Sequence, residues 1–318
     1  MNQTLELVHA AQNDLVQIGA DAEIENGALW HHATSQSGVA VIGLRCHIAH
    51  GAIICSGAQI GDDCAIGPFA VIGANAKIGS GTIIEQACTI GDGVSIGQNN
   101  KILPHSVIIN RVEIGDANTI GPFISIGTQP QHTHISVSSG KIQIGSHNVL
   151  REYMTIHMPT QESTYIGNHC FMMAYNHIPH DAVVQNYVTL ANNCQIGGHT
   201  LIQHHANLGL SCVIHQYSVI GAGAMVAMGS VIVKDIPPYV TFISGAATKL
   251  NHVGLQRSGK NDSEIESLRA LYASANTEPL KEIVQRYPNA WWYADFVEFL
   301  GAQQRKICDY ARVGASTD

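Results

Sequence analysis

An aliphatic residue or a methionine recurs at every sixth position over most of the chain. The period holds over residues 42–126, 144–156 and 166–232. A six-residue period fits neither an α-helix nor a strand of alternating polarity. It is typical of a parallel β-helix, in which each hexad forms one flat side of a coil. The sequence therefore predicts an all-β hexapeptide-repeat solenoid over residues 1–248, with three hexads, about 18 residues, in each coil.

Two interruptions of this period, residues 127–143 and 157–165, predict loops that project from the solenoid. Loops on a rigid scaffold commonly carry binding residues. The first loop contains Gln131, together with His132 and His134, and is a candidate for substrate contact. A solvated turn without a function explains the same polar run equally well.

The last part of the chain, residues 249–318, is predicted to be a helical domain. The solenoid should end at Pro237–Pro238, because proline cannot donate to a sheet ladder. Ser263 and Glu266 have the spacing of a capping box and predict the start of a helix. Two further amphipathic stretches are expected at residues 279–286 and 289–311. Their aromatic side chains are expected to form a core rather than a binding site.

Charge and hydrophobicity limit the classes of partner. The chain has 16 Lys and Arg against 24 Asp and Glu, a net charge of −8, which is unlike a nucleic-acid-binding protein. Nine of the 16 cations lie in residues 249–318, where they could meet an acidic protein or a phosphorylated ligand. No apolar run approaches the roughly 20 residues of a membrane span. With no signal peptide apparent, the expected compartment is the cytoplasm.

The cysteines follow the repeat. Six of the eight occupy the fifth place of a hexad, where a small inward side chain is expected, and no CxxC pair occurs. These six are Cys46, Cys64, Cys88, Cys170, Cys194 and Cys212. Because free cysteine behaves as a small hydrophobic residue, we expect reduced core residues rather than disulfides or a metal site.

The segment 176–181, Asn-His-Ile-Pro-His-Asp, places two imidazoles three residues apart with a carboxylate directly after the second. Histidine is the side chain best suited to proton transfer near neutral pH. Our hypothesis is that His180 is a general base, oriented by Asp181, that activates a hydroxyl or amine for acyl transfer. The alternative is that these polar residues are solvated on an exposed face and have no catalytic role.

The coil length predicts which residues meet. Residues 18 or 19 apart should be neighbours at the strand spacing of about 4.8 Å. His199 follows His180 by 19, and His215 follows on the next coil, so both should line one groove with His177. Gly198, before His199, offers an exposed backbone N–H that could stabilise an oxyanion.

Four segments in this order and at these intervals make the chain similar to a known family. They are residues 176–181, 197–199, 214–216 and 235–240. The chain resembles the acyl-carrier-protein-dependent UDP-N-acetylglucosamine O-acyltransferases, which open lipid A synthesis. The resemblance covers about residues 110–260 and extends to the helical tail. It implies a homotrimer of left-handed β-helices with active sites between subunits.

The resemblance also implies roles for individual residues. His180 would be the catalytic base, Asp181 its orienting partner and Gly198 the oxyanion donor. The implied substrate-binding residues are His177, His199, His215, Gln216, Gln131, Asn251 and Arg257. The implied reaction moves a 3-hydroxyacyl group from the phosphopantetheine of acyl carrier protein to a sugar hydroxyl, with no metal, no bound cofactor and no covalent enzyme intermediate.

The chain departs from the family pattern at several positions. His132 and His134 replace an acid and a lysine, Val253 replaces a glutamate, and Ser258 replaces an arginine. The acceptor is therefore open: UDP-N-acetylglucosamine, another amino sugar, or a secondary metabolite. Met228 stands at the family's chain-length ruler, where glycine leaves room for a longer tail. It predicts a medium-chain acyl group, nearer to about ten carbons than to about fourteen.

Two further functions compete with acyl transfer. His199 and His204 have the HxxxxH spacing of a carbonic anhydrase-like metal site, but His169 is a poor third ligand and the helical tail stays unexplained. A non-catalytic solenoid is the other alternative, which retained activity after removal of His180 would favour.

Overall fold

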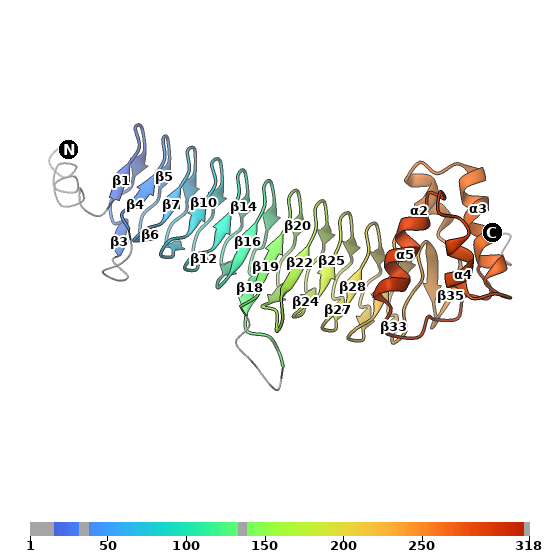
Figure 1. Ribbon diagram of the computed structural model, residues 1–318. Helices are drawn as coiled ribbons and strands as arrows, with labels where there is room; N and C mark the ends of the chain where they lie inside the picture. The colour runs from blue at the N-terminus through green and yellow to red at the C-terminus, as the bar shows by residue number, and fades with distance from the viewer. Residues whose placement is uncertain (1–15, 32–37, 133–138, 315–318) are drawn as a thin grey trace. The chain divides into compact units, whose positions relative to one another are not determined.

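The structure is a computed structural model that describes residues 16–31, 38–132 and 139–314 (Figure 1). It comprises a first unit, Met1–Ser163, and a second unit, Thr164–Asp318. Each unit contains parallel coils built from hexads, and helices follow the coils of the second unit. The predicted class, a hexapeptide parallel β-helix with a C-terminal helical part, is confirmed.

The first unit contributes one short strand per coil to each of three parallel sheets. The first sheet consists of β1 (Val16–Ile18), β4 (Ala40–Ile42), β7 (Gln59–Ile60), β10 (Lys77–Ile78), β13 (Ser95–Ile96), β16 (Val112–Ile114) and β19 (Lys141–Ile144). The second consists of β2 (Glu23–Ile24), β5 (His47–Ile48), β8 (Ala65–Ile66), β11 (Ile83–Ile84), β14 (Lys101–Ile102), β17 (Thr119–Ile120) and β20 (Val149–Leu150). The third consists of β3 (Leu29–His31), β6 (Ile53–Cys55), β9 (Val71–Ile72), β12 (Thr89–Ile90), β15 (Val107–Ile108), β18 (Ser125–Thr128) and β21 (Thr155–His157).

The second unit repeats the same three-sided arrangement. One sheet holds β22 (Ser163–Ile166), β25 (Val183–Val184), β28 (Leu201–Ile202) and β31 (Val219–Ile220). The next holds β23 (Phe171–Met172), β26 (Thr189–Leu190), β29 (Asn207–Leu208), β32 (Met225–Val226), β34 (Val240–Ile243) and β35 (Ala246–Leu250), of which β35 alone pairs antiparallel. The third holds β24 (His177–Ile178), β27 (Gln195–Ile196), β30 (Val213–Ile214) and β33 (Val231–Ile232).

The six-residue period produces a regular core. The recurring aliphatic side chain of each hexad points inward, and most of these side chains are fully buried, as at Ile66 and Ile202. Most strand partners are 18 residues apart, as in the pairing of Ile78 with Ile96, so like residues stack on like. The six cysteines predicted to lie in the core are buried, which confirms their placement. Burial raises the pKa of Cys170 to about 11, so its thiol stays protonated and unreactive near neutral pH.

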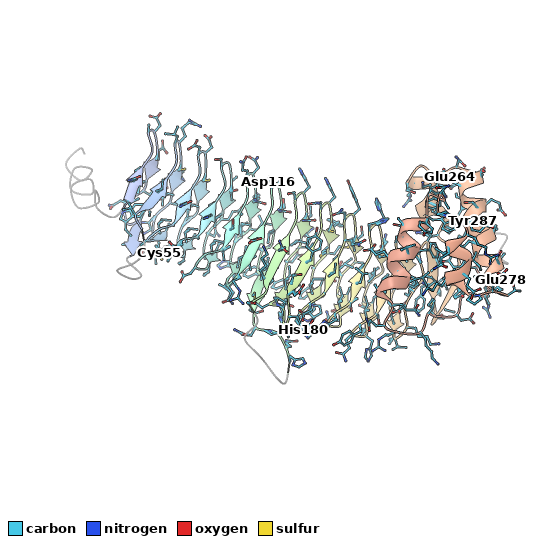
Figure 2. The ribbon with its side chains drawn as sticks, in the orientation of Figure 1. Cys55, Asp116, His180, Glu264, Glu278 and Tyr287 are labelled. Atoms are coloured by element: carbon cyan, nitrogen blue, oxygen red, sulfur yellow. The ribbon has the colours of Figure 1, made fainter. Side chains whose placement is uncertain are left out.

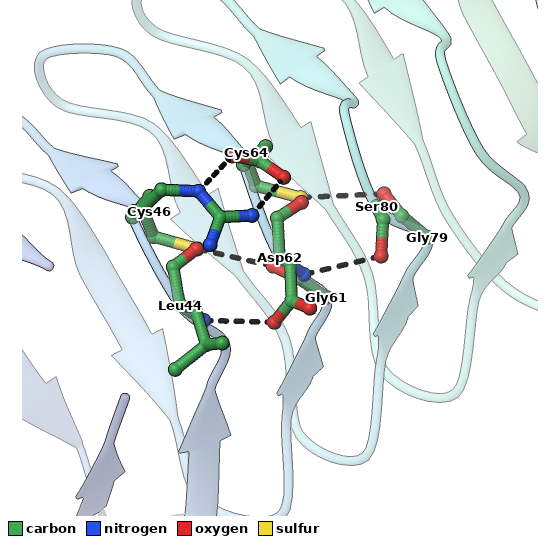
Figure 3. Close-up of polar contacts among 9 residues, drawn as sticks. Leu44, Cys46, Gly61, Asp62, Cys64, Gly79 and Ser80 are labelled. Carbon is green, nitrogen blue, oxygen red and sulfur yellow. Dashed lines mark hydrogen bonds and ion pairs between the residues drawn. The ribbon is translucent and has the colours of Figure 1, made fainter. Parts of the chain in front are cut away.

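Each hexad turns at two residues that we call the first and second corner residues, two and three places after the aliphatic residue. The second corner residue has a left-handed backbone, with φ of 53° at Arg45, 58° at Asp63 and 58° at Asp181. In the first unit the first corner residues form a ladder of backbone and side-chain hydrogen bonds (Figure 3). There the N–H of Leu44 donates to Asp62 Oδ1 at 2.8 Å, and the N–H of Asp62 donates to Ser80 Oγ at 3.1 Å.

The two interruptions are shorter than predicted. The strands beside the first run to Thr128 and from Lys141, and those beside the second run to His157 and from Ser163. Strand pairing continues past the last aliphatic residue of the period, as between Thr128 and His157. Thr133 and His134, two of the loop residues, lie outside the described residues.

The helical part consists of α2 (His252–Arg257), α3 (Asp262–Ser274), α4 (Leu280–Gln285) and α5 (Tyr293–Ala302). The predicted capping box was wrong by two residues: Asn261 and Glu264 form it, because the helix begins one residue before Ser263. The second predicted stretch is confirmed as α4, and aromatic packing of Trp292 against Phe296 supports a core role. Among the described residues, none of the helices is both long enough and apolar enough to cross a bilayer.

The third predicted helical stretch ends at Ala302 instead of residue 311. The segment beyond Ala302 pairs with the backbone of Asp235 instead. Asp235 and Ile307 form a parallel β-bridge, and the Asp235 N–H donates to the carbonyl of Lys306 at 3.0 Å. This pairing competes with continued helix, and local periodicity does not reveal it.

Candidate active site

The candidate site lies at one column of corners in the second unit, around His180, which is labelled in Figure 2. His180 and Asp181 are the corner residues after β24, and Gly198 and His199 are the corner residues after β27. Because the coil length is 18 residues, Gly198 lies against His180 and His199 lies beside Asp181. All of these contacts are made within the second unit.

His180 and Asp181 form a buried polar pair. His180 Nδ1 lies 2.9 Å from Asp181 Oδ2, and His180 is only 7% exposed. The Asp181 N–H donates to Thr164 Oγ1 at 3.0 Å, which fixes the backbone that carries the carboxylate. Since a carboxylate accepts hydrogen bonds, it favours the tautomer with the proton on Nδ1. The lone pair on Nε2 can then accept a proton from a substrate.

Glycine is required at position 198 by the imidazole beside it. A Cβ at this position would lie 2.5 Å from Cε1 and 2.8 Å from Nε2 of His180. The backbone N–H of a first corner residue donates to a side-chain oxygen at several other coils, as Asn168 does to Asn186 Oδ1 at 2.7 Å. Within the part of the chain that the structure describes, no such acceptor is found for the Gly198 N–H. This N–H is therefore suited to binding an oxyanion next to the base.

His199 and Tyr217 extend the column. The rings of His180 and His199 are 5.2 Å apart and nearly perpendicular, and His199 Nε2 lies 3.7 Å from Asp181 Oδ2. The predicted meeting of His180 with His199 is confirmed. Tyr217 stacks flat on His199, with centroids 4.5 Å apart and an interplanar angle of 1°. Sequence reasoning missed Tyr217, although its place 18 residues after His199 indicated the stack.

The other predicted histidines have different surroundings. His177 is half-buried on the face of β24, where it pairs with Gln195 of β27. His215 is exposed, and its Nδ1 lies 2.6 Å from Arg305 Nη2. Gln216 is also exposed, and its carbonyl accepts from Arg305 Nε at 2.8 Å. Sequence reasoning missed Arg305, which lies about 90 residues further along the chain.

The predicted nucleotide segment lies at α2. Asn251 caps this helix by accepting from the Gly254 N–H at 3.1 Å, and its Nδ2 donates to the Gly223 carbonyl at 2.9 Å. Arg257 is exposed in the last turn. A cavity of about 220 Å³ lies beside this segment. Its lining residues are Thr241, Lys249, Leu250, Asn251, His252, Val253 and Arg269.

The structure shows where Met228 and Gln131 lie, but it does not test the role predicted for either residue. Met228 is 73% exposed, on the chain after β32. Gln131 is exposed in the first unit, in the loop after β18, and its contact with substrate stays a prediction.

A second polar cluster joins α5 to the coils of the second unit. Asp295 of α5 accepts from Tyr239, and its Oδ1 lies 2.7 Å from His204 Nε2. The hydrogen bond to Asp295 raises the pKa of His204 despite its partial burial. Burial alone would raise the pKa of Asp295, but hydrogen bonds from His204 and Tyr239 bring it below its ordinary value. Burial lowers the pKa of the neighbouring His205.

These contacts also bear on the metal-site alternative. His204 contacts Asp295 and His199 lies beside Asp181, so the two residues of the HxxxxH pair belong to different clusters. A different set, His180, Asp181 and His199, has ligand atoms that all lie within 4.8 Å of one another. Two imidazoles and a carboxylate are suitable ligands for a divalent transition metal. That no metal takes part in the function stays a prediction.

Comparison with known proteins supports the resemblance. The model of domain 2 of UDP-N-acetylglucosamine O-acyltransferase matches residues 235–308, and the bacterial transferase hexapeptide model matches residues 40–74 and 69–99. A curated acyl-[acyl-carrier-protein]–UDP-N-acetylglucosamine O-acyltransferase from Pseudomonas entomophila is 40% identical over 124 residues, which are 37% of this chain and 48% of that protein. The chain thus spans about half the length of the curated relatives it matches.

Solved structures cover more of the chain. UDP-N-acetylglucosamine O-acyltransferase from Moraxella catarrhalis is 25% identical, with a TM-score of 0.64 over 91% of this chain and 98% of its own. The acyltransferase of this name from Bacteroides fragilis is 28% identical, with a TM-score of 0.64 over 77% and 97%. In part of its sequence and in its fold, the chain is therefore similar to UDP-N-acetylglucosamine O-acyltransferases.

Proposed function

We propose that the chain is an O-acyltransferase that moves an acyl group from acyl carrier protein to a hydroxyl of a sugar nucleotide such as UDP-N-acetylglucosamine. The names of the relatives support this reaction class. The observation that carries the proposal is the buried His180–Asp181 pair, whose imidazole lies against the backbone of Gly198. This arrangement supplies a base, its orienting carboxylate and an oxyanion donor within two neighbouring coils.

In the proposed mechanism His180 Nε2 removes the proton of the acceptor hydroxyl as its oxygen attacks the thioester carbonyl. A C–O bond forms, and the carbonyl oxygen becomes an oxyanion that the Gly198 N–H binds. Asp181 stabilises the imidazolium that results. When the C–S bond breaks, the imidazolium returns its proton to the departing thiolate. The products are the sugar ester and the free thiol, so no metal, bound cofactor or enzyme ester is needed.

The remaining residues are assigned to binding. His177, His199, His215, Gln216 and, from the first-unit loop, Gln131 would contact the reactants. Asn251 and Arg257 would contact the nucleotide, beside the cavity at α2. Met228 would limit the acyl chain to medium length. The proposed partner is acyl carrier protein, which supplies acyl-phosphopantetheine, and the proposed setting is a homotrimer in the cytoplasm that contributes to lipid A synthesis.

A second acceptor is favoured by one feature of the α2 cavity. Val253, 57% exposed, lines this cavity where the resemblance implies a glutamate. An apolar side chain cannot accept a hydrogen bond from a nucleotide base or sugar. The alternative is therefore the same acyl transfer to a different amino sugar or a secondary metabolite.

An acceptor panel tests the proposal. Purified full-length protein would be incubated with medium-chain acyl carrier protein and UDP-N-acetylglucosamine, other UDP-amino sugars, or free amino sugars, and ester products would be measured by mass spectrometry. We expect an ester with at least one sugar acceptor. Transfer to another amino sugar alone would select the alternative acceptor. No transfer to any acceptor, combined with stoichiometric zinc in the purified protein, would favour the metalloenzyme instead.

A further inference from the structure

The segment that follows α5 fixes the backbone of Arg305 against the end coil of the second unit. The Arg305 N–H donates to Asp235 Oδ2 at 3.2 Å, and Asp235 Oδ1 accepts from the Val219 N–H at 2.8 Å. Asp235 is fully buried, and its carbonyl accepts from the Cys308 N–H at 2.8 Å. Hydrogen bonds to Asp235 therefore fix both the backbone of Arg305 and the segment in which it lies.

The guanidinium of Arg305 reaches from this segment to two coils. Nε donates to the Gln216 carbonyl at 2.8 Å, and Nη1 donates to the Val233 carbonyl at 3.3 Å. Nη2 lies 2.6 Å from Nδ1 of His215. The two carbonyl contacts orient the planar group, so its third contact is directed at one ring nitrogen of His215.

The chemistry of the guanidinium decides which nitrogen of His215 carries the proton. Arginine has five N–H donors and no acceptor, so His215 Nδ1 must accept in this contact. Nδ1 also lies 3.2 Å from the Gln216 carbonyl, which would favour a proton on Nδ1. A proton on Nδ1 would point at the N–H of Arg305 Nη2, with only 2.6 Å between the two nitrogens, and the two donors would repel each other. The Gln216 carbonyl does not need this proton, because it already accepts a hydrogen bond from Arg305 Nε. The proton of the neutral ring is therefore on Nε2.

We propose that Arg305 is a positioning residue that fixes His215 in its Nε2–H tautomer, so that His215 offers substrate a hydrogen-bond donor. The group it would recognise is an oxygen acceptor, such as a phosphate, hydroxyl or carbonyl oxygen of a reactant. This assignment of a substrate contact rests on the proposed function. The tautomer itself follows from contacts within the chain.

The test uses nitrogen NMR of ¹⁵N-histidine-labelled full-length protein, with the His215 signals assigned from a His215→Asn variant. In the wild type we expect a protonated Nε2 and an unprotonated Nδ1 that accepts a hydrogen bond. In Arg305→Met the Nδ1 signal should change in one of two ways. It should move towards the position of a nitrogen that accepts no hydrogen bond, or towards that of a protonated nitrogen that donates to the Gln216 carbonyl. Arg305→Lys, which keeps a donor, should retain the wild-type signals in part.

A kinetic arm uses the same variants. Arg305→Met should raise the KM for one reactant roughly tenfold with a smaller change in kcat, because the variant loses the side chain that orients a binding imidazole, and Arg305→Lys should rescue it in part. Lys306→Met, which removes the neighbouring exposed cation, should change neither the signals nor KM. A proton on Nδ1 in the wild type, or the same His215 signals in the wild type and a folded Arg305→Met, would overturn the proposal. If the protein transfers no acyl group, the NMR result still decides the tautomer, and the proposed function fails separately.

Discussion

The two units use the corner positions of the hexad for different purposes. In the first unit the first corner residues Leu44 and Asp62 form a ladder, and the second corner residues Arg45 and Asp63 form an exposed ion pair (Figure 3). In the second unit, after two strands of the third sheet instead of the first, the same hexad positions hold His180 with Gly198 and Asp181 with His199. The side chains of Arg45 and Asp63 are 54% and 53% exposed, whereas those of His180 and Asp181 are 9% and 6% exposed.

This difference indicates that the coils determine where the corner side chains lie, whereas the residue types at the corners determine whether those side chains can carry out a reaction. An exposed ion pair contributes little to stability, about 0–1 kcal/mol. A buried imidazole and carboxylate have a desolvation cost that their mutual hydrogen bond must offset. A buried pair is a costly way to hold the turn, because exposed residues at the same hexad position in the first unit hold it without this cost. Its presence there is therefore better explained by catalysis, and matched substitutions in the two units can test that explanation.

The first matched pair, for which a large effect is expected, compares the second corner carboxylates of the two units. Asp181→Asn should lower kcat by on the order of 100-fold or more, because an amide does not stabilise the imidazolium or select its tautomer. Asparagine tolerates the left-handed backbone at this position, with φ of 58°, so the fold should persist. Steady-state acyl transfer and thermal unfolding would be measured. Asp63→Asn is the control in the first unit and should leave kcat unchanged; equal kcat values for both variants would break the comparison.

A smaller loss is expected when a methyl group is placed against the base. In Gly198→Ala the new Cβ would meet the His180 ring at 2.5 Å and displace it. Displacement of a reacting group by about 1 Å costs up to roughly 100-fold, so kcat should fall about 10- to 100-fold. Gly301→Ala in α5, where a Cβ meets nothing within 4 Å, is the control. Full activity in Gly198→Ala would argue against the placement of the base.

A third test concerns the predicted role of Met228 in limiting the length of the acyl chain. Met228→Gly should increase the preference for longer acyl chains by at least about tenfold, since one methylene is worth about 1–3 kcal/mol in a hydrophobic pocket. Competition assays with acyl carrier proteins of several chain lengths would measure this ratio. An unchanged preference would remove Met228 from the acyl site.

The smallest effect on activity, and a clear one on stability, is expected at the second cluster. The raised pKa of His204 gives stability that is full below its ordinary value of about 6.5 and is lost as pH rises through the raised value. The lowered pKa of Asp295 gives stability that is present above about 3.9 and is lost in acid. Asp295→Asn should therefore cost about 1–2 kcal/mol of unfolding free energy near pH 6 and less near pH 9.

Urea unfolding at the two pH values would measure this difference. Glu266→Gln is the matched control, because Glu266 pairs with Arg269 on the surface of α3 and is 68% exposed. It should change stability by only a few tenths of a kcal/mol at either pH. A destabilisation of Asp295→Asn that is larger at pH 9 would contradict the assigned charge states.

The sequence was informative wherever the period determined the neighbours. Stacking at 18 or 19 residues predicted the meeting of His180 with His199. The contact between Gly198 and the His180 ring was not predicted, although it follows from the same 18-residue spacing. The same arithmetic would have found Tyr217. Contacts made by the C-terminal segment follow no period, so Arg305 beside His215 and Asp295 beside His204 were not predicted. The capping box and the end of the last helix depend on local competition that periodicity does not resolve.

The central claim is that the imidazole of His180, the first corner residue after β24, is the base, while Asp62, the first corner residue after β7 in the first unit, is structural. The most direct test compares His180→Ala with Asp62→Ala in acyl transfer and in thermal unfolding. The account predicts that His180→Ala loses on the order of 10²–10⁴-fold in kcat while it stays folded at the assay temperature, whereas Asp62→Ala keeps its kcat. A folded His180→Ala variant with activity close to that of the wild type would contradict it.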